Sequence, residues 1–199
     1  MFTPLPAKID GDGFTEALWD QLVENHNRGV MRPLATTLLA SSAASITFSG
    51  IAGSWLHLCL MLTARGTNAS GFVNLTVRFN GDAGANYDTQ HVSAAGTTST
   101  AAEALAASGF LMAGFPAASA PAGRFGSLEL WVPGYASTDR EKVAVATNGR
   151  FYDDTTTNFA TQQGGCWWRS TAAITEVAFS LSAGSFAAGT RATLYALGG

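Results

Sequence analysis

The sequence has 14 acidic side chains, which could do acid–base chemistry, so we consider them first. A glycosidase needs two carboxyl groups about 5–10 Å apart. Glu129 and Glu176 each fall in a stretch that alternates like a strand, on the face opposite the better apolar row. Nothing in the sequence brings two acidic residues together. We therefore expect solvated strand faces and turns rather than a catalytic pair.

Nucleophilic catalysis has one weak candidate, the pair His57 and Cys59, which share one face of a predicted strand. The pair lacks a third group that would orient the base, and no Gly-x-Ser-x-Gly motif exists. The other cysteine, Cys166, is distant in sequence. In a protein that folds in a cytoplasm two such cysteines are expected to be free thiols. We expect no enzyme.

Metal binding is expected to be absent as well, and so is any other cofactor. The acidic residues near turns are Asp10, Asp12, Asp82, Asp88, Asp153 and Asp154. Oxygen clusters of this kind suit Ca²⁺, but the segment Asp10-Gly11-Asp12-Gly13 lacks the later ligands and the distal glutamate of an EF-hand loop. No Cys-x-x-Cys pattern predicts a zinc site. Turn formation and helix capping account for these residues.

The aromatic residues indicate a binding surface more clearly. In Trp167-Trp168-Arg169 the two indoles must face opposite sides if the segment is a strand. An outward aromatic ring beside an arginine can stack on a sugar or anchor a protein partner. The candidate stacking or partner-contact residues are Trp168, Trp131, Tyr152 and Arg169. The competing interpretation is that the second tryptophan packs on a loop or on a sister chain.

Composition narrows the classes of function. Of 199 residues, 47% are hydrophobic and only 13% are charged, about half the roughly 25% of an average soluble domain. A net charge of −3 without a basic run argues against nucleic acid as a partner. No apolar segment reaches the roughly 18 residues of a membrane span, and the first residues do not resemble a secretory signal. A surface of small neutral residues predicts assembly with other copies or other proteins.

Residues 1–43 are expected to form an attachment segment, because charge is dense there and β alternation is absent. The segment begins extended and continues as a helix over residues 15–28, with acids at its start and Arg28 and Gly29 at its end. One helix cannot form a core alone. The apolar stripe of this helix is Leu18, Trp19, Leu22 and Val23.

Residues 44–199 are expected to form one antiparallel β-sandwich of jelly-roll type, with about eight strands. Period-two alternation predicts strands at 46–48, 54–64, 73–79, 124–132, 142–147, 164–169, 174–181 and 190–197. The stretch 83–122 is poor in β-formers and is expected to be a long excursion with a helical turn near 101–107. The predicted core comprises Ile46, Phe48, Leu58, Leu60, Val77, Phe79, Leu130, Val177, Phe179 and Leu194.

The strand at 54–64 is apolar on both faces. Alternate positions carry Leu56, Leu58, Leu60 and Leu62 on one face, and Trp55, Cys59 and Met61 on the other. A strand with one wet face alternates more cleanly. The apolar second face is therefore expected to be buried, either under the N-terminal helix or against a neighbouring copy of the chain. We expect a homo-oligomer, most readily a trimer.

Four segments resemble small tail- or capsid-associated structural proteins of tailed phages of actinobacterial type. They are Phe2–Asp12, Ile46–Ala52, Val77–Asp82 with Asn86-Tyr87, and Thr190–Leu197. The resemblance implies a virion component in several copies, such as a minor tail protein, fibre tip or spike, attached through its N-terminus and contacting the host surface. It implies trimers, other virion proteins as partners, and no catalytic residues. The alternatives are a carbohydrate-binding module that binds a host cell-surface glycan, a capsid decoration or fibre protein, and an envelope-degrading hydrolase.

Overall fold

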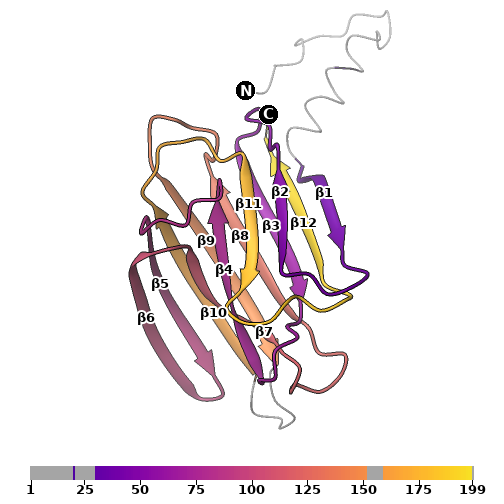
Figure 1. Cartoon of the computed structure of the whole chain (residues 1–199). Coiled ribbons are helices and arrows are strands. Elements are labelled where there is room, and N and C mark those ends of the chain that lie inside the picture. The colour runs from indigo at the N-terminus through magenta and orange to yellow at the C-terminus, as the bar shows by residue number, and fades with distance from the viewer. Residues whose placement is uncertain (1–19, 21–29, 152–158, 199) are drawn as a thin grey trace, which may run out of the picture.

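The computed structural model describes residues 20, 30–151 and 159–198, in which two antiparallel β-sheets pack together (Figure 1). The larger sheet has eight strands in the order β1-β12-β3-β8-β9-β10-β5-β6. Their bounds are β1 (Arg32–Leu38), β12 (Arg191–Leu197), β3 (His57–Ala64), β8 (Gly126–Pro133), β9 (Lys142–Phe151), β10 (Phe159–Trp168), β5 (Tyr87–Ala95) and β6 (Thr98–Ala107).

The smaller sheet has four strands in the order β2-β11-β4-β7, and it lies across the centre of the larger one in Figure 1. Its strands are β2 (Ser45–Ser49), β11 (Glu176–Leu181), β4 (Phe72–Phe79) and β7 (Phe110–Pro116). The all-β sandwich expected from the sequence is thus confirmed. The N-terminal helix falls on residues outside those described. Within them, no helix is long and apolar enough to cross a membrane.

The core lies between the sheets and is formed by alternate residues of each strand, because successive side chains of a strand point to opposite faces. In β4 the buried positions are Val73, Leu75, Val77 and Phe79. All ten residues predicted for the core are buried, and the most exposed of them, Phe48, is 5% exposed. The alternation pattern therefore identified the inward face of each of these strands.

The expectation for residues 83–122 was wrong. That stretch contains β5, β6 and β7, and residues 101–107, expected as a helical turn, belong to β6. β5 and β6 form a hairpin through Gly96 and Thr97, and Gly96 has a φ of 57°. A two-residue loop of this kind favours glycine, which adopts positive φ without steric cost. Pairing with β5 therefore outweighs the weak β propensity of an alanine-rich segment.

Three further expectations need correction. The described chain has twelve strands rather than about eight, and β9 and β10 each run ten residues. Residues 32–38, expected to lie in a segment without β structure, pair with β12 as strand β1. β3 begins only at His57, and Leu56 before it is 58% exposed rather than inward. The apolar character of a residue does not by itself distinguish a position on the inner face of a strand from a position just before the strand begins.

The outer face of β3 is covered in part by its own sheet. Cys59 is fully buried and stands between Trp131 of β8 and Tyr195 of β12 in the strand register. Cross-strand neighbours of this kind have Cβ atoms about 4.5–5.5 Å apart, so large side chains shield a small one. Met61 on the same face stays 40% exposed. The predicted cover by a helix or a second copy is therefore not needed for Cys59.

Candidate functional site

The two tryptophans at the end of β10 have opposite environments. Trp168 points into the core and is 2% exposed, whereas Trp167 lies on the outer face and is 45% exposed. The sequence-based choice of Trp168 as a stacking residue is therefore wrong, and Trp167 is the indole that a ligand can reach. The sequence could have indicated this orientation through Cys166. Free cysteine is among the most buried residue types, and Cys166 lies on the same strand face as Trp168.

Trp168 is part of a buried aromatic cluster. Its ring centroid lies 5.5 Å from that of Phe79 and 6.3 Å from that of Tyr87, and its Nε1–H donates to Asp82 Oδ2 at 2.7 Å. That hydrogen bond is the main reason why the pKa of Asp82 is lowered. Asn86 also donates to this carboxylate. The segment Val77–Asp82 with Asn86-Tyr87 thus has a structural role here.

Because the pKa of Asp82 is lowered, we expect the free energy of unfolding to fall in acid. Its folded-state pKa lies below the usual value of an aspartic acid side chain, so below about pH 4 the unfolded chain binds more protons than the folded one. We expect this contribution to be complete above the unfolded pKa and to be lost as pH falls through the folded pKa. Urea unfolding between pH 7 and pH 2, at about one-unit steps, measures it.

The matched comparison is Asp82→Asn, whose amide oxygen still accepts the Trp168 N–H but does not titrate. Its free energy of unfolding should fall less steeply in acid than that of the wild type. Asp139→Asn tests the same linkage at an exposed carboxyl: the pKa of Asp139 is lowered to about 2, mainly by Ser137 and then by Arg140, so this variant should also lose part of the acid dependence. Equal acid slopes in the wild type and Asp82→Asn would contradict the assignment.

Trp167 is held in a fixed orientation by charged neighbours. Its Nε1–H donates to Glu141 Oε2 at 2.6 Å, and the guanidinium carbon of Arg169 lies 5.6 Å from its ring centroid. Arg169 is itself fixed by Asp88, to which its Nε donates at 2.9 Å, and this contact is the main reason why the pKa of Asp88 is lowered. The predicted site residue Arg169 therefore supports the exposed indole.

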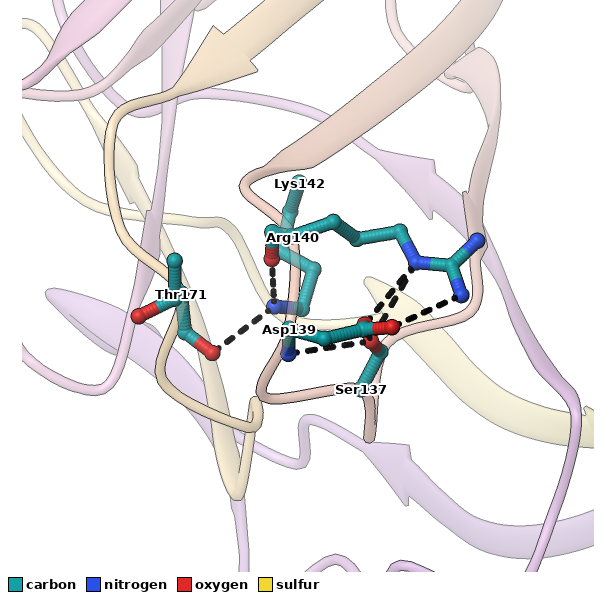
Figure 2. Close-up of polar contacts among 5 residues, drawn as sticks. All are labelled: Ser137, Asp139, Arg140, Lys142 and Thr171. Atoms are coloured by element: carbon teal, nitrogen blue, oxygen red, sulfur yellow. Dashed lines mark hydrogen bonds and ion pairs between the residues drawn. The ribbon is translucent and has the colours of Figure 1, made fainter.

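The loop that carries Glu141 is anchored by its neighbours, as Figure 2 shows. Lys142 is 1% exposed, and its Nζ donates to the carbonyl oxygens of Arg140 at 2.8 Å and Thr171 at 3.2 Å. Burial lowers the pKa of this ammonium group. Glu141 lies between Arg140 and the buried Lys142 in sequence. The carboxylate that orients Trp167 thus sits on a stretch of backbone fixed on its C-terminal side.

Beside Trp167 the outer face has a hollow of about 280 Å³, which we call the Trp167 hollow. Its lining residues are Asp88, Thr89, Gln90, Glu103, Leu105, Val143, Gly165, Cys166 and Trp167. The register aligns one row of outer-face residues across five strands: Glu103, Gln90, Gly165, Val145 and Trp131. Gly165 is the low point of that row, because it has no side chain.

A β-bulge shapes the far wall of the hollow. The register between β5 and β6 shifts between Tyr87 and Thr89, and Ala106 in the bulged segment has a φ of 50°. The N–H of Ala106 donates to Asp88 Oδ1 at 2.8 Å. Leu105 in this bulge is 64% exposed and lines the hollow. Bulges re-aim side chains in this way, often beside functional sites.

The two edges of the eight-stranded sheet differ. β1 contains Pro33, and its register with β12 shifts between Pro33 and Ala35, features that normally protect an edge. In the described structure β6 pairs only with β5, in regular register from Thr98 to Ala104. Eight of its ten residues are exposed and two are half-buried, and Glu103 is its only charged residue. β6 is therefore an unprotected edge.

The remaining predicted site residues are not gathered in one place. Trp131 is half-buried on the outer face of β8, where its Nε1–H donates to Glu129. Tyr152 lies outside the described residues. So do the predicted attachment-helix residues Leu18, Trp19, Leu22 and Val23.

The groups considered for catalysis do not form a centre either. Glu129 lies on β8 and Glu176 on β11, in different sheets. Burial and, secondarily, Glu129 raise the pKa of Cys59 to about 12, so its thiol is protonated at neutral pH. Nδ1 of His57 accepts the N–H of Gly134 at 3.3 Å. Both cysteines are free, as predicted. Among the residues that the structure describes, no three His, Cys, Asp or Glu are grouped to hold a metal ion.

No family model matches this chain, and no curated protein matches it either. Any functional assignment therefore rests on the geometry of the outer face and of β6, together with the sequence patches described above.

Proposed function

We propose that this chain is a non-enzymatic structural component of a tailed-phage virion, present in several copies. It serves as a minor tail protein, fibre tip or spike, and residues 1–43 serve as its attachment segment. The four resembling segments support the virion context. The observation that carries a role in assembly is the unprotected edge strand β6.

An isolated soluble protein normally blunts a long edge strand with lysine, proline or a bulge, because free N–H and C=O groups recruit further strands. β6 runs ten residues, mostly exposed, and its bulge lies only at its C-terminal end. The neighbouring apolar side chain of Val92 is 51% exposed. We infer that another copy of the chain covers this edge, since a surface with so little charge does not repel its own copies.

The strand order supports a jelly-roll interpretation of the sandwich. Strands β2, β4, β7 and β11 lie in the small sheet, whereas β1, β3, β5 with β6, β8 to β10, and β12 lie in the large one. The chain therefore crosses between the sheets at eight of the eleven connections between the described strands, a pattern similar to that of a double Greek key. In this interpretation the β5–β6 hairpin occupies an edge of the large sheet, where a neighbouring copy can reach it.

Replacing Ala102 of β6 by lysine tests the proposal. A charge on an edge strand opposes strand addition, so Ala102→Lys should behave as a 20.6 kDa monomer in light scattering. The wild type should give a multiple of that mass, three copies being the number that the resemblance implies. Mass spectrometry of purified particles should detect the wild-type chain and find Ala102→Lys strongly depleted.

The control is Thr147→Lys, which adds the same charge at an exposed position of the central strand β9, beside Glu129 in the register. It should assemble like the wild type. A wild-type chain that is monomeric and absent from particles would overturn the proposal. Assembly of Ala102→Lys at wild-type levels would show that β6 is not the contact.

A further inference from the structure

We propose that the Trp167 hollow binds a neutral hexopyranose ring of a surface saccharide, stacked on the indole of Trp167. This inference goes beyond the proposed role in assembly and does not depend on it, because the hollow is complete within one chain. Three features of the hollow support this binding: a rigid aromatic platform, open space in front of it, and polar groups at its border.

The platform is rigid before any ligand binds. Gly165 and Trp167 lie at alternate positions on the outer face of β10, and Arg169 follows directly after the strand ends at Trp168, so the ring stands between the hollow and the guanidinium. Arg169 packs 5.6 Å from the ring centroid and is held by Asp88, while Glu141 holds Nε1. An aromatic group that is already oriented loses little entropy on binding.

The open space depends on Gly165, and the fold does not require a glycine there. A Cβ at this position would meet only the carbonyl oxygen of Ala144, at 3.7 Å, which is an ordinary contact. Its neighbour Gly164 differs, since a Cβ there would lie 3.0 Å from both His91 and Met112. A glycine inside a strand weakens it, and often marks the close approach of a ligand. A ligand bound in the hollow would therefore explain why residue 165 is a glycine.

The border of the hollow selects the chemistry of the ligand. Gln90 and Glu103 face each other across β5 and β6, and neither side chain makes a hydrogen bond to another described residue. Amide and carboxylate groups suit the hydroxyls of a sugar, whose C–H faces suit Trp167, Val143 and Leu105. The site is also surrounded by negative charge, from Glu103, Glu141 and Asp88. Asp88 already forms an ion pair with Arg169, which is therefore not available to bind an acidic ligand. Uronic and sialic acids are thereby disfavoured, and a neutral ring is favoured.

The size agrees with a small ligand. The hollow measures about 280 Å³, near the lower end of the roughly 300–1,000 Å³ of sites for drug-sized molecules. One sugar ring would fill it.

The test is an NMR titration of the purified chain with cellobiose, maltose and N,N′-diacetylchitobiose, with digalacturonate as the acidic counterpart. The indole Nε1–H signal of Trp167 should shift with at least one neutral disaccharide at millimolar concentration and should not shift with digalacturonate. Trp167→Ala should weaken binding at least tenfold, measured for that variant from the saccharide signals. Its oligomeric mass should equal that of the wild type.

Gly165→Val provides a second variant that leaves Trp167 in place. Valine favours strands and has room here, so the variant should fold with at least wild-type thermal stability and lose saccharide binding at least tenfold. Trp131→Ala is the matched control and should retain binding within about twofold, because Trp131 does not line the hollow.

Three results would overturn the inference: no response to any neutral disaccharide, unchanged binding by Gly165→Val, or loss of binding only in Trp131→Ala. A change of oligomeric mass in Trp167→Ala would also overturn it, because the indole would then contact a second copy. None of these outcomes depends on whether the chain joins a particle, so this inference and the proposed function fail separately.

Discussion

Replacing Trp168 by alanine should lower the free energy of unfolding by about 3–5 kcal/mol, the range for buried tryptophan or phenylalanine. The indole is 2% exposed and packs against Phe79 and Tyr87. Its removal leaves a cavity between the sheets and takes away the N–H that Asp82 accepts at 2.7 Å. Urea unfolding at pH 7, followed by circular dichroism, measures the loss.

Two neighbouring variants separate the contributions. Trp168→Phe keeps an aromatic ring but not the N–H, so it should cost less than alanine, about 1.5–3 kcal/mol for a hydrogen bond to a charged group. Trp167→Ala removes an indole that is 45% exposed and should change stability far less than Trp168→Ala. Similar losses for Trp167→Ala and Trp168→Ala would contradict the inward and outward assignment of the two rings.

Leu60→Ala should cost about 2–5 kcal/mol, because it empties a fully buried position in the centre of β3. Leu60 stands between Leu130 of β8 and Leu194 of β12, and both are themselves buried. The sheets cannot close over the missing side chain without moving both neighbours, so most of the cavity should persist. Thermal and urea unfolding of the purified variant give the free-energy difference.

Thr63→Ala on the same strand is the control, since Thr63 is exposed on the opposite face. It should lie within about 0.5 kcal/mol of the wild type, as surface substitutions usually do. A cost for Leu60→Ala of the same small size would mean that the inward face of β3 is misassigned.

The amino-acid sequence by itself determined which face of most strands is buried. Alternation is a local property, and in β2, β4 and β11 one set of alternate residues is clearly more apolar than the other. All ten predicted core positions were recovered for this reason. The pair Asn80-Gly81 has the composition of a local turn signal, and both residues adopt positive φ. Patterns of this kind need no knowledge of what lies across the core.

Where the two faces of a strand have similar composition, the sequence did not predict the strand or its buried face. β6 is built mainly of alanine, serine and threonine, and its β conformation depends on pairing with β5 rather than on its own propensity. β10 alternates between two mixed sets of residues, so alternation did not identify which indole faces the core, and the sequence-based choice of Trp168 as the stacking residue was wrong. Tertiary packing decided this, by placing Trp168 against Phe79 and Tyr87.

The candidate site depends on tertiary structure for the same reason. Glu103, Gln90, Gly165 and Trp167 come from three strands, and only the strand order β10-β5-β6 makes them neighbours on one face. Their types suggested no motif, because their spacing in sequence bears no relation to their spacing in the sheet. Side-chain alternation is encoded locally, whereas strand neighbours are chosen by the lowest free energy of the whole sheet.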